Sequence, residues 1–101
     1  MHQNPNLIII VSEHAWDGAV SISEYLENRF SKSLAIDYLK SLELAWNALA
    51  SMPDLGVKFK GKVRKLIWKK YTHIFYRYDY NYLYILEIID SRSVRTFNFF
   101  N

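Results

Sequence analysis

The residues of this chain that could do chemistry are concentrated in its second half. Residues 55–78 contain eight Lys or Arg side chains and no Asp or Glu. Ammonium and guanidinium groups bind phosphate and carboxylate oxygens, so this basic stretch predicts a surface for an anionic partner. The alternative is a solvated edge strand whose lysines block edge-to-edge pairing. Eight positive charges without one acid are more than that protection requires, and we favour a binding surface.

The cationic side chains fall into an alternating run and a set of dispersed arginines. Lys58, Lys60 and Lys62 alternate, so in an extended stretch their ammonium groups point the same way and form a stripe. Arg92 follows the last expected strand, at a position where loops often carry functional groups. We expect the target-binding side chains to be Arg64, Arg77, Arg92, Lys58, Lys60, Lys62 and Lys65.

His73 is the main candidate for acid–base chemistry. It lies in an expected strand among basic residues, where an imidazole could act as a general base, although such a residue more often belongs simply to the strand surface. The other histidines, His2 and His14, complete no metal-ligand spacing, and the chain has no Cys. Glycine-rich phosphate loops, nucleophile elbows and paired-carboxylate motifs are absent. We therefore expect no metal and no cofactor, and whether the chain is an enzyme stays open.

Composition indicates one folded domain over residues 1–101. Half of the residues are apolar and 17% are aromatic, which is enough to form a core. Residues 1–54 carry three basic and seven acidic side chains, whereas residues 55–101 carry ten basic and three acidic ones. The apolar run at 7–11 is much shorter than the ~20 residues that span a bilayer. We expect a soluble, cytoplasmic protein with no membrane partner.

The hydrophobic pattern places these residues on a small sheet. Residues 7–11 are expected to form a strand buried on both faces, followed by a helix that starts at Ser12 and runs to about residue 30. Gly18 is expected to weaken this helix by about 1 kcal/mol relative to Ala. A second helix follows the break at 31–33 and ends before Pro53.

Residues 52–61 are expected to be a loop, and three strands at 63–68, 72–79 and 82–90 to form an antiparallel meander. The order β-α-α-β-β-β predicts a two-layer α+β fold, with an antiparallel helical hairpin packed on a small, mainly antiparallel sheet. Most of the aromatic side chains at 71–84 are expected to pack within this sheet, although stacking on bases is an alternative. Glu87 lies among apolar residues in the last strand, and we expect it to pair with a basic side chain.

The ordered segments of the chain resemble the RelE/ParE superfamily of type II toxin–antitoxin toxins. The resemblance covers residues 7–95. It rests on the order of "ISEYLENRF" at 22–30, "AIDYLKSLELAWNALASMPDLG" at 35–56, "VRKLIWKKYTHIFYRYD" at 63–79 and "YLYILEIIDSR" at 82–92. Its most specific part is the helix-end "MPDLG" followed by three strands that carry arginines.

The resemblance implies a helical hairpin on a curved sheet and two alternative activities. RelE-like members cleave mRNA on the ribosome without a metal, using clustered Lys, Arg, Tyr or His. ParE-like members inhibit DNA gyrase. Members of both branches are held inactive by a cognate antitoxin that wraps the toxin. The resemblance thus implies an antitoxin partner, a possible toxin–antitoxin hetero-oligomer and a role in plasmid stabilisation.

Two departures from the RelE-like pattern favour the ParE-like branch. His73 stands where RelE-like members usually have Arg, and no Tyr follows Tyr84. The resemblance therefore predicts a gyrase-inhibiting toxin. The alternatives are a ribosome-dependent mRNA endonuclease, with His73, Arg64 and Arg77 as catalytic candidates, and a non-enzymatic nucleic-acid-binding module. A cationic cluster of Arg64, His73, Arg77 and Arg92 on one side of the sheet would count against the ParE-like branch.

Overall fold

The structure is a computed structural model that describes residues 6–92. The resemblance noted above reaches residue 95, and its last three residues lie outside this range. The described part contains two helices, α1 (Glu13–Arg29) and α2 (Lys32–Ser51). Each begins at a serine: the hydroxyl of Ser12 accepts a hydrogen bond from the Ala15 amide, and the hydroxyl of Ser31 accepts one from the Leu34 amide. The start at Ser12 was predicted from its cap, and the second helix was expected to follow the break at 31–33, where Ser31 is the cap.

The strands are β1 (Ile8–Val11), β2 (Val57–Lys60), β3 (Val63–Trp68), β4 (Thr72–Tyr78) and β5 (Tyr82–Asp90). They form one five-stranded sheet in the order β1-β5-β4-β3-β2. Only β1 and β5 run parallel. The predicted α+β class, the helical hairpin and the antiparallel meander are confirmed. The predicted loop at 52–61 is wrong in part, because residues 57–60 pair with β3 as an additional edge strand.

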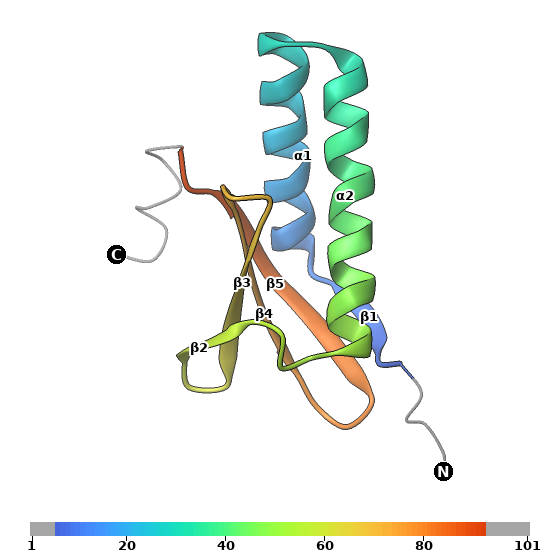
Figure 1. Cartoon of the computed structure of the whole chain (residues 1–101), viewed down its shortest axis with the longest axis vertical. Coiled ribbons are helices and arrows are strands. Elements are labelled where there is room, and N and C mark those ends of the chain that lie inside the picture. The colour runs from blue at the N-terminus through green and yellow to red at the C-terminus, as the bar shows by residue number, and fades with distance from the viewer. Residues whose placement is uncertain (1–5, 93–101) are drawn as a thin grey trace.

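The helices cover one face of the sheet and leave the other uncovered (Figure 1). They run antiparallel to each other, and α1 packs along β5. The core lies between the two layers and is formed by the inward side chains of the helices and the central strands, among them Leu42, Leu49, Ile74, Tyr76, Leu83, Ile85 and Ile88.

The prediction that β1 is buried on both faces is wrong. Ile9 and Val11 pack against the core, whereas Ile8 and Ile10 are 58% and 41% exposed. The reason is that β1 is an edge strand of a sheet with helices on one side only. We call the uncovered side, which includes Ile8 and Ile10, the open face.

At Gly18, helix α1 lies close against the backbone of β5. A Cβ built at this position would lie much closer to the carbonyl oxygen of Ile88 on β5 than real Cβ atoms approach other atoms. The glycine therefore serves helix–sheet packing, a function that its helix propensity does not reveal.

Candidate functional site

The strand register separates the predicted cationic residues between the two faces of the sheet. Arg64 lies directly opposite Tyr76, whose side chain is fully buried in the core under the helices. His73 and Arg77 alternate with Tyr76 along β4, so they lie on the open face. Arg64 therefore does not join His73 and Arg77 in a cationic cluster on one side of the sheet.

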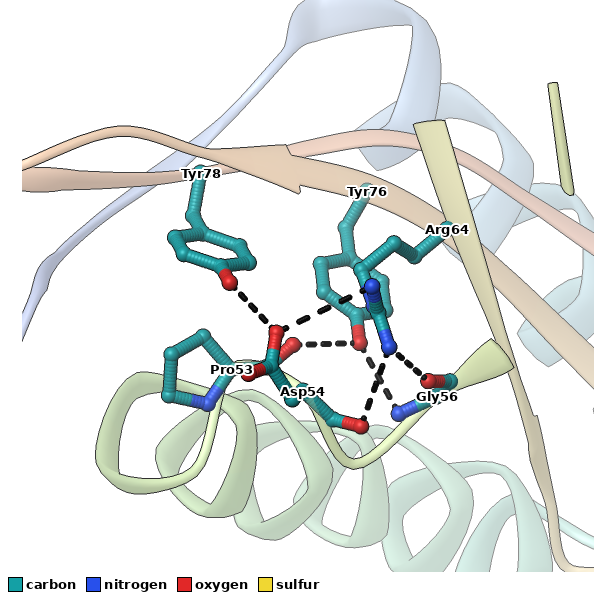
Figure 2. Close-up of polar contacts among 6 residues, drawn as sticks. All are labelled: Pro53, Asp54, Gly56, Arg64, Tyr76 and Tyr78. Carbon is teal, nitrogen blue, oxygen red and sulfur yellow. Dashed lines mark hydrogen bonds and ion pairs between the residues drawn. The ribbon is translucent and has the colours of Figure 1, made fainter. Parts of the chain in front are cut away.

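Arg64 is held by the connection between α2 and β2 (Figure 2). Its guanidinium donates hydrogen bonds to the carbonyl oxygens of Gly56, at 2.8 Å, and Asp54, at 3.2 Å. It also lies 3.7 Å from the Asp54 carboxylate, and its side chain is only 17% exposed. These contacts orient residues 54–56, and two of the five N–H donors of Arg64, both on one terminal nitrogen, are used in them.

Two tyrosines of β4 complete this network (Figure 2). The Tyr76 hydroxyl donates to the carbonyl oxygen of Pro53 at 2.7 Å and accepts from the Gly56 amide at 2.9 Å. The Tyr78 hydroxyl donates to the carboxylate of Asp54, and this hydrogen bond raises the pKa of Tyr78. The network fixes the segment at which the chain passes from the helical layer to the sheet.

Of the predicted target-binding residues, Arg77 and Lys65 have side chains that lie on the open face. The Arg77 guanidinium lies 4.1 Å from the centre of the Tyr84 ring, its direct neighbour on β5. The Tyr84 hydroxyl in turn donates to Asp79 at 3.2 Å. Lys65 lies opposite Phe75, and its ammonium group is 5.7 Å from the ring centre of Phe59. Both cations thus stand on aromatic surfaces, which fix their positions while leaving charge available to a partner.

His73 also lies on the open face, opposite Ile67 of β3. Burial and the positive charge of Lys65 lower the pKa of His73 below its ordinary value of 6.5. The imidazole is therefore mostly uncharged at neutral pH and adds little to the positive potential of the face. Because Arg64 lies on the other face, the structure does not bring the three catalytic candidates together.

The predicted stripe of Lys58, Lys60 and Lys62 does not form. Lys58 lies opposite Arg64, and Lys60 lies opposite Val63, so a register shift between them places the two lysines on different faces. Gly61, with φ of +57°, then turns the chain before Lys62. A β-bulge of this kind breaks the alternation on which the prediction relied.

Arg92 lies at the far end of the sheet, beside the β3–β4 turn. It forms a two-pronged ion pair with Asp90, with distances of 3.0 Å from Nε and 2.6 Å from the terminal nitrogen. Burial alone would raise the pKa of Asp90, but these bonds outweigh it and lower the pKa. The Arg92 guanidinium also lies 4.3 Å from the centre of the Tyr71 ring. Its side chain remains about half exposed.

A small pocket opens between α1, β2 and the middle of the open face. Its volume is about 260 Å³, and its apolar wall is formed by Phe59, Val63, Phe75 and Leu86. The rings of Phe59 and Phe75 meet edge-to-face with their centres 4.9 Å apart. The sequence did not predict this pocket, because Phe59 belongs to the strand that was expected to be a loop.

The polar groups of this pocket are His14, Lys60 and Glu87. Glu87 is buried, with 7% of its surface exposed, and its Oε1 contacts Nε2 of His14. The expectation that Glu87 pairs with a basic side chain is confirmed. Burial raises the pKa of Glu87 from 4.5 to about 7. The partner could not be read from the sequence, because His14 reaches Glu87 only through the parallel pairing of β1 with β5.

The raised pKa of Glu87 predicts a specific pH dependence of stability. Between about pH 4.5 and about pH 7 the folded state keeps a proton that the unfolded state releases, so the free energy of unfolding falls as the pH rises through this window. We expect a loss of about 2 kcal/mol across the window in the wild-type chain relative to Glu87→Gln. Urea denaturation of both proteins from pH 4 to pH 8 measures it. Parallel profiles for the two proteins would contradict the prediction.

Two further findings concern residues 6–92 as a whole. In this part of the chain no three His, Asp or Glu side chains are placed to hold a metal ion. Neither of the two helices described there has the length and apolarity that a bilayer crossing requires.

Comparisons with known proteins give a match in structure and none in sequence. No protein-family model matches the chain, and no curated protein matches it. Among solved structures, a chain described as "Chromosomal ParDE TA system from P. aeruginosa" superposes with a TM-score of 0.73. The match covers 83% of this chain and 95% of that chain, at 14% sequence identity. This chain therefore has a ParE/RelE-like toxin fold.

Proposed function

We propose that this chain is the toxin of a type II toxin–antitoxin system, that it inhibits DNA gyrase, and that a cognate antitoxin neutralises it in a hetero-oligomer. The observation that carries the proposal is the superposition on a chain of a ParDE toxin–antitoxin system over 95% of that chain's length. The match covers most of both chains, so it supports a shared overall arrangement.

The geometry ranks the proposed target contacts. Arg77 and Lys65 present charge on the open face, where no helix covers them. Arg92 offers a half-exposed guanidinium at the end of the sheet, and Lys58, Lys60 and Lys62 surround the β2–β3 turn. Arg64 is held by carbonyl oxygens of residues 54 and 56, and we propose that it supports the α2–β2 connection more than it contacts a target.

The endonuclease alternative receives less support from the geometry. A mechanism in which His73 transfers a proton while Arg64 and Arg77 stabilise the phosphate needs these groups within reach of one substrate. Arg64 and His73 lie on opposite faces of the sheet.

Induction of the chain without an antitoxin tests the proposal. We expect early arrest of DNA synthesis and filamentous cells, with protein synthesis continuing at first, and inhibition of gyrase supercoiling by the purified chain. Early arrest of translation with cleaved mRNA would favour the endonuclease. Unimpaired growth, together with uninhibited supercoiling, would contradict both activities.

Arg77→Gln tests the role of the open face in target binding. We expect this variant to lower the inhibition of supercoiling more than 10-fold, because a central Arg of an interface is often worth about 2 kcal/mol or more. Loss of its contact with the Tyr84 ring costs about 0.5–1 kcal/mol of stability, which leaves the chain folded.

Arg29→Gln is the matched control, since it removes the same charge from an exposed site at the end of α1. It should leave inhibition within about twofold of the wild type, because a remote exposed charge acts only through screened electrostatics. Equal inhibition by the two variants would show that Arg77 makes no specific contact.

A further inference from the structure

The pocket beside β2 combines three features that constrain its ligand: an apolar aromatic wall, a buried carboxyl group and a cationic surrounding. We propose that it is the binding site for one aromatic side chain with an N–H or O–H donor, Trp or Tyr, presented by an acidic segment of a partner protein that pairs with β2. The proposal rests on the proposed function insofar as the partner is the antitoxin.

The wall of the pocket accounts for the aromatic group. Phe59, Val63, Phe75 and Leu86 form a surface for a flat apolar ring, and Phe59 already packs edge-to-face on Phe75. A further ring against this pair gains both apolar burial and aromatic contact. The volume of about 260 Å³ is below the usual range for drug-sized ligands, and it suits one side chain.

The carboxyl group of Glu87 is the reason to propose that the bound ring carries a hydrogen-bond donor. Its two oxygens provide more acceptor sites than the contact with His14 uses. Burial disfavours the ionised form, which is the cause of its raised pKa. An indole N–H or a phenol O–H directed at this carboxyl group would replace a hydrogen bond to water that the group loses when it is buried.

The edge position of β2 is the reason to propose that the partner binds as an extended peptide. The lysines around the pocket are the reason to propose that this peptide is acidic. The sheet order places β2 at an edge, where a strand has backbone N–H and C=O groups available for pairing with another chain. Phe59 and Lys60 of this strand both line the pocket. A peptide that extends the sheet along β2 therefore brings alternate side chains over the open face. Lys60, which lines the pocket, and Lys62 and Lys65 near it favour acidic side chains in that peptide and repel basic ones.

A pair of small probes tests the pocket independently of any toxic activity. Indole and 1-methylindole have the same ring system, but only indole has the N–H donor. We expect the purified full-length chain to bind indole at least 5-fold more tightly than 1-methylindole, as measured by amide chemical shifts of residues around the pocket. Glu87→Met, which keeps the length of the side chain without its oxygens, should bind the two probes equally. Val63→Trp, which fills the pocket, should bind neither.

Short acidic peptides with a central Trp, Tyr, Phe or Ala test the partner. Binding in the order Trp and Tyr above Phe above Ala, with the Trp preference lost in Glu87→Met, supports the proposal. Equal binding of all four peptides would overturn it. Guanosine monophosphate is the probe for a nucleotide site. Binding of this nucleotide at the pocket, together with no binding of the Trp peptide, would also overturn the proposal. Amide spectra and thermal melts establish that each variant is folded.

Two more outcomes separate this proposal from its alternatives. Tighter indole binding after replacement of Phe97, Phe99 and Phe100 by Ala would assign the pocket to the chain's own C-terminal residues, and would overturn the partner site. A chain that binds the Trp peptide and yet fails to inhibit gyrase would contradict the proposed target and support the peptide site.

Discussion

Replacing Gly18 with Ala is expected to lower the free energy of unfolding by about 2 kcal/mol, although Ala is the better helix former. The new methyl group would clash with the carbonyl oxygen of Ile88, which is backbone and cannot rotate away. Separating α1 from β5 to relieve the clash opens the most extensive helix–sheet contact of the fold. Overpacking costs about 1–3 kcal/mol, and a clash with backbone lies at the upper end of that range, so that about 2 kcal/mol remains after the gain of about 1 kcal/mol in helix propensity.

Ser21→Ala is the matched control for this prediction, because Ser21 lies in the same helix and is exposed. It gains helix propensity without a clash and should raise stability by a few tenths of a kcal/mol, about 0.5 at most. Urea denaturation of the two variants gives the comparison. A Gly18→Ala chain as stable as the wild type would show that α1 can move away from β5 at little cost.

Replacing Tyr76 with Phe is the second substitution for which we expect a large effect, a loss of about 2–4 kcal/mol. The hydroxyl of this fully buried residue accepts from the amide of Gly56 and donates to the carbonyl oxygen of Pro53. The substitution removes both bonds and leaves the two backbone groups without this partner. Each buried backbone group left unsatisfied costs about 1–3 kcal/mol.

The same substitution should be visible locally as well as in global stability. The amide proton of Gly56 should exchange with solvent faster by more than 10-fold, since its acceptor is gone. Tyr80→Phe is the matched control, because Tyr80 is 94% exposed and its loss of a hydroxyl should change stability by less than about 0.5 kcal/mol. Unchanged exchange at Gly56 in Tyr76→Phe would show that another group replaces the tyrosine.

Much of the fold was predictable because local patterns agree with the tertiary arrangement. The serine caps set the helix starts, and apolar alternation set β3, β4 and β5 to within one residue. Strand β2 was missed although its sequence, VKFK, alternates apolar and basic residues. It is only four residues long, and Pro53, Gly56 and Gly61 around it are signals of a loop. Its pairing with β3 depends on the turn at Gly61 and on tertiary context, which the sequence signals of a loop obscured.

The site was less predictable, for reasons that differ between residues. The face of Arg64 could have been derived, because a turn at residues 69–71 pairs Trp68 with Thr72 and therefore Arg64 with Tyr76. The contact between His14 and Glu87 could not, since it depends on a parallel pairing between strands some 70 residues apart in the sequence. The bulge after Lys58 likewise has no clear signature in the sequence.

The position of β5 has a consequence for how the protein is made. This strand is the last of the described elements in chain order, yet it lies between β1 and β4 and carries the contact with α1. During translation β1 and α1 emerge first and must wait for β5 before the sheet can close. The open face is therefore incomplete while the chain is still being synthesised, and it forms only after β5, which joins β1 to the rest of the sheet, has left the ribosome.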